Sequence, residues 1–271
     1  MKKNSLKMYL PFALNTFQKN LSYRANAVIF VLGNSIMLLV SYYLWKAVYG
    51  SSSNSEINGF SLNEMMVYIL ISFLTSLITS ADIVYDITSE VRDGSIAINL
   101  IRPINYEKRM MFQSFGNILY NFVVIFIAAF IIVSILFIRF SGKLSISNFV
   151  FYFVSAFMSI LISFYYNYCF GLLSFKLTNM WGIKQIMGAV FQLLSGTLIP
   201  IIFFPKVFQT LFNFLPFSSI VYTPTMIYLG KLSGLEMLKA LLIQFVWIFV
   251  LAGIAKLMWK TLIKRLTILG G

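Results

Sequence analysis

The chain of 271 residues contains no histidine and one cysteine, Cys169, which lies in an apolar stretch. The missing histidine removes the commonest metal ligand and the commonest general base. A lone cysteine excludes an internal disulfide and a cysteine-based metal cage. Charged residues are also scarce, at 11%, where a soluble domain carries about 25%. These absences exclude a water-soluble globule.

The sequence is instead rich in apolar residues. They make up 59% of the chain, and the mean hydropathy is +0.85. A helix needs about 20 apolar residues to cross a bilayer, and the long runs show no alternation of polar and apolar residues typical of a barrel strand. The sequence therefore predicts an all-α integral membrane protein with six transmembrane helices. The predicted spans are 27–48, 63–81, 111–138, 149–175, 184–204 and 236–259.

The basic residues are unevenly divided between the two sides of the predicted bundle. The net charge is +13, and 15 of the 21 Lys and Arg residues fall in the N-terminal arm, the 82–110 loop, the 176–184 turn and the C-terminal end. Loops rich in Lys and Arg stay in the cytoplasm. We therefore expect a multi-pass protein of the cell membrane with both termini cytoplasmic. Its basic charge is matched to anionic lipid rather than to nucleic acid.

The first 26 residues lack a signal peptide's apolar core and cleavage site. Leu6, Leu10, Ala13, Phe17 and Leu21 instead recur at near-helical spacing. This pattern favours an amphipathic helix on the inner leaflet over a disordered basic arm.

The segment 82–110 is the longest polar stretch and holds five of the eight acidic residues. Its periodicity predicts an amphipathic extension of the second span that Gly94 ends. We expect Ser95 to cap a second short helix, which must stop before Pro103. That helix is too apolar to face water, so either a partner or the membrane covers it. Its apolar residues are Ile96, Ile98, Leu100 and Ile101.

A second irregular stretch covers residues 203–230, which are mostly apolar but interrupted by prolines. Pro200 predicts a kink near the outer end of the fifth span. The stretch after it is too broken to span and too apolar for an exposed loop. We therefore predict a re-entrant helical hairpin that dips in from outside, rather than an outer loop packed on neighbouring spans.

The run from Glu90 to Pro103, with Gly94, Ser95 and Leu100 between them, resembles the signature of type-2 ABC (ABC-2) exporter permeases. The segment 198–230 and the ending 264–271 are similar to a subgroup with two permeases and one separate ATPase. The resemblance implies that 82–110 forms a coupling loop whose short helix docks on the ATPase, with Glu90 bracing it. It also implies a dimeric ATPase partner, a second permease of the same or another chain, and an amphipathic substrate that leaves the cell.

Polar residues inside the spans are almost all uncharged, which weakens an ion-driven carrier. Ser72, Thr75, Ser76 and Thr79 form one stripe on the second span. The stripe, together with Gln192, Ser195 and Thr197, is open to two interpretations. It lines a substrate path or a permease contact, or it only holds helices together, which is the commoner role of small polar residues.

The chain has no Gly-x-x-x-x-Gly-Lys-[Ser/Thr] motif. We therefore expect it to bind no cofactor, with ATP and Mg²⁺ on the partner ATPase, and not to be an enzyme. Two alternatives remain open. One is the membrane coupling subunit of an importer, whose Ala-Arg-Gly-type motifs are missing here. The other is an intramembrane enzyme acting on lipid or peptide, which would need clustered titratable groups.

Overall fold

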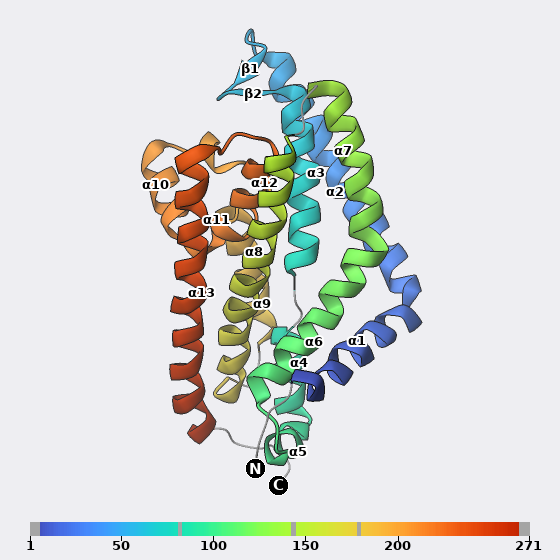
Figure 1. The fold of residues 1–271 in the computed structure, drawn as a ribbon, viewed down its shortest axis with the longest axis vertical. Helices are drawn as coiled ribbons and strands as arrows, with labels where there is room; N and C mark the ends of the chain where they lie inside the picture. Colours follow the sequence, from blue (N-terminus) through green and yellow to red (C-terminus); the bar gives the residue numbers. More distant parts are fainter. Residues whose placement is uncertain (1–5, 81–82, 142–144, 178–179, 266–271) are drawn as a thin grey trace.

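The computed structural model describes residues 6–80, 83–141, 145–177 and 180–265. In this part the chain is helical apart from its connections and one short antiparallel hairpin, in which β1 (Glu56–Ile57) pairs with β2 (Phe60–Ser61). The molecule is elongated, with this hairpin at one end and α5 (Ser95–Ile101) at the other (Figure 1). We refer to these as the hairpin end and the α5 end.

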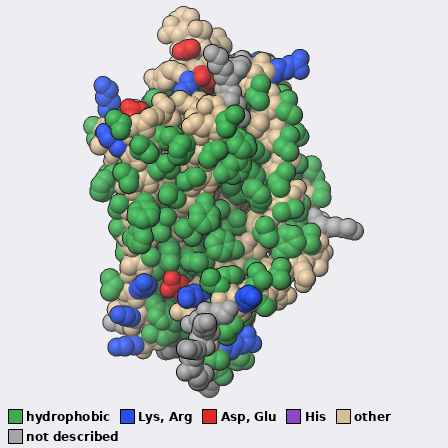
Figure 2. Space-filling view, viewed as in Figure 1, with side chains coloured by type: hydrophobic (Ala, Val, Ile, Leu, Met, Phe, Trp, Pro, Cys, Tyr) green, Lys and Arg blue, Asp and Glu red, His purple; other side chains and the backbone are tan. Residues whose placement is uncertain are grey.

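Five segments of the described chain are long and apolar enough to cross a membrane: 28–51, 62–92, 106–139, 146–175 and 234–262, of which the second runs over residues 81–82. Apolar side chains form a broad band around the middle of the molecule, and charged side chains gather toward its two ends (Figure 2). The chain is therefore an all-α integral membrane protein, as predicted. The segments are built from α2 (Arg24–Ser51), α3 (Leu62–Thr79), α4 (Ile83–Arg92), α6 (Tyr106–Asn121), α7 (Ile127–Ser141), α8 (Ile146–Leu172), η3 (Leu173–Phe175) and α13 (Gly234–Leu262).

The fifth predicted span, 184–204, is not a single kinked helix. α9 covers only Trp181–Leu194, about 21 Å of helix against the roughly 30 Å of a hydrocarbon core. It stops because Gly196 adopts a left-handed φ of 77° and because Pro200, four residues on, cannot donate a backbone hydrogen bond. The expected kink is thus the end of the helix, which a count of apolar residues cannot detect.

Short helices replace a simple hairpin in the predicted re-entrant stretch 203–230. They lie beside the hairpin-end halves of α8 and α13, whereas α9 lies nearer the α5 end (Figure 1). One of them, α12, is buried over its whole length except Tyr222, which is half-buried. The depth of this stretch in a membrane stays a prediction. The pieces are η4 (Ile201–Phe203), α10 (Lys206–Phe214), α11 (Pro216–Ile220) and α12 (Tyr222–Tyr228).

The N-terminal arm forms η1 (Leu6–Met8) and α1 (Leu10–Ser22), which runs obliquely along α6 (Figure 1). One face of α1 packs so closely on α6 that a Cβ at Gly116 would overlap the carbonyl oxygen of Ala13. The other face exposes leucines, as expected of a helix at an interface. Its position on a membrane stays a prediction. Residues 1–5 of the arm and 266–271 of the tail, which follows η5 (Ile263–Arg265), lie outside the described part.

A π-helical segment, η2 (Phe122–Phe126), joins α6 to α7. The long helix changes direction there (Figure 1), as expected where an extra residue enters the hydrogen-bond ladder. The Asn121 amide donates to the Leu77 carbonyl oxygen at 3.2 Å and so ties this point to the last turn of α3. The bend therefore lies level with the break between α3 and α4.

Candidate functional site

The turn between α4 and α5 is built around Gly94. Its φ is 75°, in the left-handed region that glycine adopts without strain. α4 ends at Arg92 and α5 spans Ser95–Ile101. The sequence thus predicted correctly that Gly94 separates two helices and that the second ends before Pro103.

Ser95 does not cap the second helix as predicted. It is the first residue of α5, and its backbone N–H and Oγ donate to Asp93 Oδ1 at 3.0 and 2.6 Å. A carboxylate satisfies a free N–H at a helix start better than the residue's own hydroxyl can. The hydrogen bond from the Ser95 hydroxyl, with that from its backbone, holds the pKa of Asp93 below its ordinary value.

Glu90 joins α4 to α6. Its two carboxylate oxygens each accept a hydrogen bond of 2.7 Å from Arg109 Nη2, and Oε2 also accepts one of 2.9 Å from the Tyr106 hydroxyl. The side chains of Arg109 and Glu90 are 6% and 13% exposed. Buried charges of this kind are tolerated only when paired and hydrogen-bonded. Glu90, Tyr106 and Arg109 form what we call the Glu90 brace.

Aromatic rings extend the brace toward α13. The Arg109 guanidinium lies over the Tyr106 ring, 4.9 Å from its centre, and Tyr106 stacks on Trp259 with the ring centres 5.2 Å apart. Trp259 also meets Phe175 edge-on at 5.9 Å. The end of α4 is therefore held by α6, α13 and η3 together.

The short helix α5 presents two different faces. Ile96 is buried in the cluster beneath α4, and Leu100 packs against that cluster. Ile98 and Ile101, three residues apart, are 58% and 83% exposed, and Pro103 follows in an exposed turn. The helix is thus anchored on one side and presents two isoleucines on the other.

The polar stripe of α3 acts mainly as a packing seam. Ser72 and Thr75 are fully buried and donate to carbonyls of their own helix. Thr75 Oγ1 also shares a 3.0 Å hydrogen bond with the Tyr152 hydroxyl of α8. The interpretation as helix contact therefore holds for this part of the stripe.

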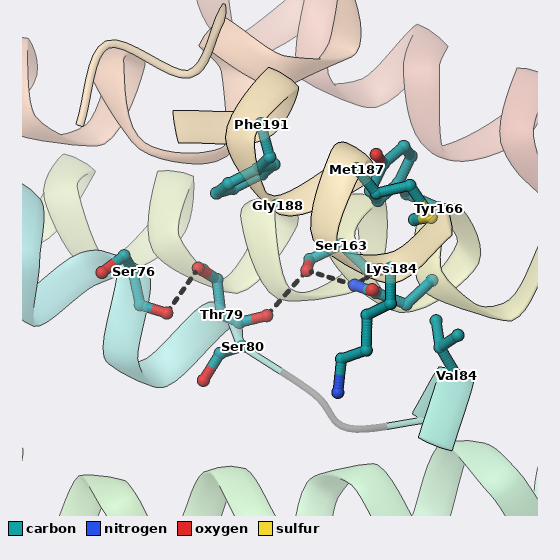
Figure 3. Close-up of a pocket in the computed structure, with 11 residues that line it drawn as sticks. Ser76, Thr79, Ser80, Val84, Ser163, Tyr166, Lys184, Met187, Gly188 and Phe191 are labelled. Carbon is teal, nitrogen blue, oxygen red and sulfur yellow. Dashed lines mark hydrogen bonds between the residues drawn. The ribbon is translucent and has the colours of Figure 1, made fainter. Parts of the chain in front are cut away.

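The other end of the stripe borders a pocket. Ser76 and Thr79 meet α8 and α9 where α3 ends, around a cavity of about 200 Å³ (Figure 3). Ser163 Oγ donates to the Thr79 carbonyl oxygen at 2.7 Å, and the Asn167 amide donates to Ser163. The remaining wall is mixed in character: Ser80, Val84, Tyr166, Lys184, Met187, Gly188 and Phe191.

Gln192, Ser195 and Thr197, the three polar residues singled out in the fifth predicted span, do not lie together in the structure. Ser195 is buried and shares a 2.7 Å hydrogen bond with the Thr197 hydroxyl. The turn that they form is held by α3, because the Tyr68 hydroxyl donates to the Gly196 carbonyl oxygen at 2.6 Å. Gln192 lies on the exposed side of α9 and does not join them. Neither group borders the pocket.

Comparison with known families decides what kind of protein has this architecture. The model of the ABC-2 family transporter proteins matches residues 35–270, almost the whole membrane bundle. The chain belongs to the ABC-2 family of transporter proteins. It is therefore the membrane permease of an ABC transporter, and its family implies an ABC ATPase partner. No curated protein matches the chain.

An ABC-2 permease is a transporter component and not itself an enzyme. Its residues must bind partners and change arrangement rather than break covalent bonds. The two features described above suit those tasks: a turn with an anchored short helix at the α5 end, and a pocket of mixed lining deeper in the bundle, at the break in the second span.

Several residues of these sites were not singled out in the sequence. Arg109 and Tyr106 lie three residues apart and so share a face of α6, but nothing local in the sequence links them to Glu90. The sequence does indicate that Glu90 needs a partner, because Glu90 lies beside Val91 and near Ile87 on the apolar face of α4. An acid on a buried face needs a buried partner. The pocket residues Ser163 and Lys184 carry no such signal.

Proposed function

We propose that this ABC-2 permease belongs to an ATP-driven exporter that moves an amphipathic substrate, such as a peptide, lipid, glycan or drug, out of the cell. A separate ATPase dimer binds the α5 end, which faces the cytoplasm. The single observation that carries the proposal is the pair Ile98 and Ile101, exposed on a short helix whose other face is buried. An exposed apolar face on an anchored helix suits a groove on a partner.

The Glu90 brace supports the transmission of force. A docking helix can move the membrane helices only if it is firmly attached to them, and ATP-driven closure must distinguish two arrangements. The brace ties α4, next to α5, to α6 by a buried ion pair. A push on α5 is thus delivered to the second and third spans together.

The pocket supports an amphipathic substrate. Its wall combines the hydroxyls of Ser76 and Ser80 with the rings of Tyr166 and Phe191, the mixture expected of a site that binds a molecule with polar and apolar parts. The second permease would cover α2 and the shorter α9, because most residues of both helices are exposed.

Substitution at the exposed face of α5 tests the proposal. With the ATPase and its substrate in proteoliposomes, Ile98→Asp/Ile101→Asp should abolish stimulation of ATP hydrolysis while membrane insertion is retained. Ile146→Asp is a matched control, since Ile146 is also 83% exposed but is the first residue of α8 and not part of α5. Normal stimulation in the double variant would refute docking at α5. Uptake into inside-out vesicles checks the direction, and accumulation only in right-side-out vesicles would indicate an importer.

A further inference from the structure

A second cavity, of about 320 Å³, is lined by residues of α2, α3 and α7. α3 and α7 lie in the hairpin half of the molecule (Figure 1). Leu38 and Tyr42 line it from α2, and Leu136 lines it from α7. Met66 and Leu70 are among its residues from α3, and Asn63 lies at the start of that helix. We call this cavity the α2 crevice. It shares no lining residue with the pocket of Figure 3.

The α2 crevice exists because α2 separates from the bundle. Near its hairpin end α2 is attached through Trp45 and Tyr49, which are buried, and Tyr49 donates to the Phe60 carbonyl oxygen at 2.7 Å. Only 6% of the most apolar stretch of α2 is buried against the rest of the bundle. Apart from Tyr42 and Asn63 the lining is aliphatic, and an aliphatic wall offers water too few hydrogen-bond partners to hold it. Hydrocarbon is the occupant that a membrane supplies.

The shape of the crevice suits an extended acyl chain. From Asn63 to Leu70 the wall on α3 is about 10 Å long at 1.5 Å per residue. Apolar side chains line this length, and the polar groups Asn63 and Tyr42 are the exceptions. The crevice thus combines an apolar interior with a polar rim toward the hairpin end of α3.

The cationic side chain of Lys46 lies close to that rim. Lys46 lies one turn beyond Tyr42 on α2, and its Nζ is 5.8 Å from the centre of the Tyr42 ring. Lys46 forms no ion pair with another described residue. The nearby acid Glu64 is already held by Lys231 Nζ at 2.7 Å and by Ser61. The charge left over at the mouth is therefore positive.

We propose that the α2 crevice binds one anionic phospholipid of the surrounding bilayer. An acyl chain lies between Leu38, Met66 and Leu70, and the phosphate meets Lys46 at the rim with the Tyr42 hydroxyl and the Asn63 amide. The lipid replaces the helix contacts that α2 lacks and so holds α2 at a fixed distance from α3.

Native mass spectrometry of the full chain, purified from bilayers of equal phosphatidylglycerol and phosphatidylcholine, tests the site. The wild type should retain one phospholipid, with phosphatidylglycerol preferred about five-fold, the equivalent of one lysine near an anionic headgroup. Met66→Trp and Leu70→Trp fill the crevice and should each remove the retained lipid. Ile36→Trp, on the exposed side of α2, is the control and should retain it.

Lys46→Gln tests the headgroup without altering the packing. It should keep the lipid but lose the preference for phosphatidylglycerol, whereas Lys239→Gln, which removes an exposed cation of α13, should change nothing. An unchanged preference in Lys46→Gln would overturn the proposal. So would equal lipid retention by the wild type and the two crevice-filling variants.

Discussion

At the scale of single residues, the Glu90 brace shows how far local sequence carries the argument. Glu90 could be singled out because it interrupts an apolar helix face, and its bracing role was expected from the family resemblance. Its partners Tyr106 and Arg109 could not, because the α4–α6 pairing depends on the turn between the helices. Ser95 was misassigned because Asp93, two residues earlier, competes for the same free N–H.

Removing one member of the brace should cost more than removing both charges. Arg109→Met leaves the Glu90 carboxylate buried and unpaired, which destabilises a protein by about 3–5 kcal/mol. Glu90→Gln/Arg109→Met should recover a large part of that loss. Thermal unfolding of the detergent-purified variants measures both. If the single variant unfolds at the wild-type temperature, Glu90 and Arg109 are not coupled as described.

Gly94 gives a second test at this scale. Gly94→Ala should weaken ATPase stimulation, because an alanine in the left-handed region costs about 1–2 kcal/mol. Gly94→Pro should abolish it, because proline fixes φ near −65°. Gly50→Ala is the control, since Gly50 lies in α2 with open space around its Cβ position. Full stimulation in Gly94→Pro would show that the turn is not needed.

At the scale of elements, hydrophobic runs predicted five of the long helices but not the interruptions. In the stretch 184–204 the sequence predicts a kink at Pro200 but not the end of the helix, which the left-handed Gly196 places at Leu194. The π-helical segment Phe122–Phe126 also gives no signal in the sequence, because Phe, Val and Ile are common in any apolar helix. The apolar runs of the sequence therefore predict where long helices lie, whereas the interruptions within them depend on backbone conformation and on neighbouring elements.

The contact between α1 and α6 is another property of elements that can be tested. The amides of Asn20 and Asn117 lie 2.7 Å apart, so Asn20→Cys/Asn117→Cys should crosslink on oxidation. Adding Gly116→Leu pushes α1 away from α6 and should strongly reduce the crosslink. Gly33→Leu, at an open position of α2, should leave it unchanged. Equal crosslinking in the Gly116→Leu and Gly33→Leu variants would contradict the close packing of α1 on α6.

At the scale of the whole molecule, the bundle presents more apolar surface on α2 and α9 than it buries there. If a second permease covers these helices, a cysteine at Ile186 of α9 should crosslink to it within the assembled transporter. A cysteine at Leu257 of α13 should not, although the two positions are 67% and 66% exposed. A crosslink at Leu257 but not at Ile186 would place the second permease on the opposite side.

The central claim is that the α5 end is the surface on which the ATPase acts. A photo-crosslinking amino acid at Ile101, the most exposed residue of α5, tests it directly in the assembled transporter. The account predicts capture of the nucleotide-hydrolysing chain from Ile101 and none from the equally exposed Ile146. Capture from Ile146 alone, or labelling of a cysteine at Ile101 by an impermeant reagent outside intact cells, would contradict it.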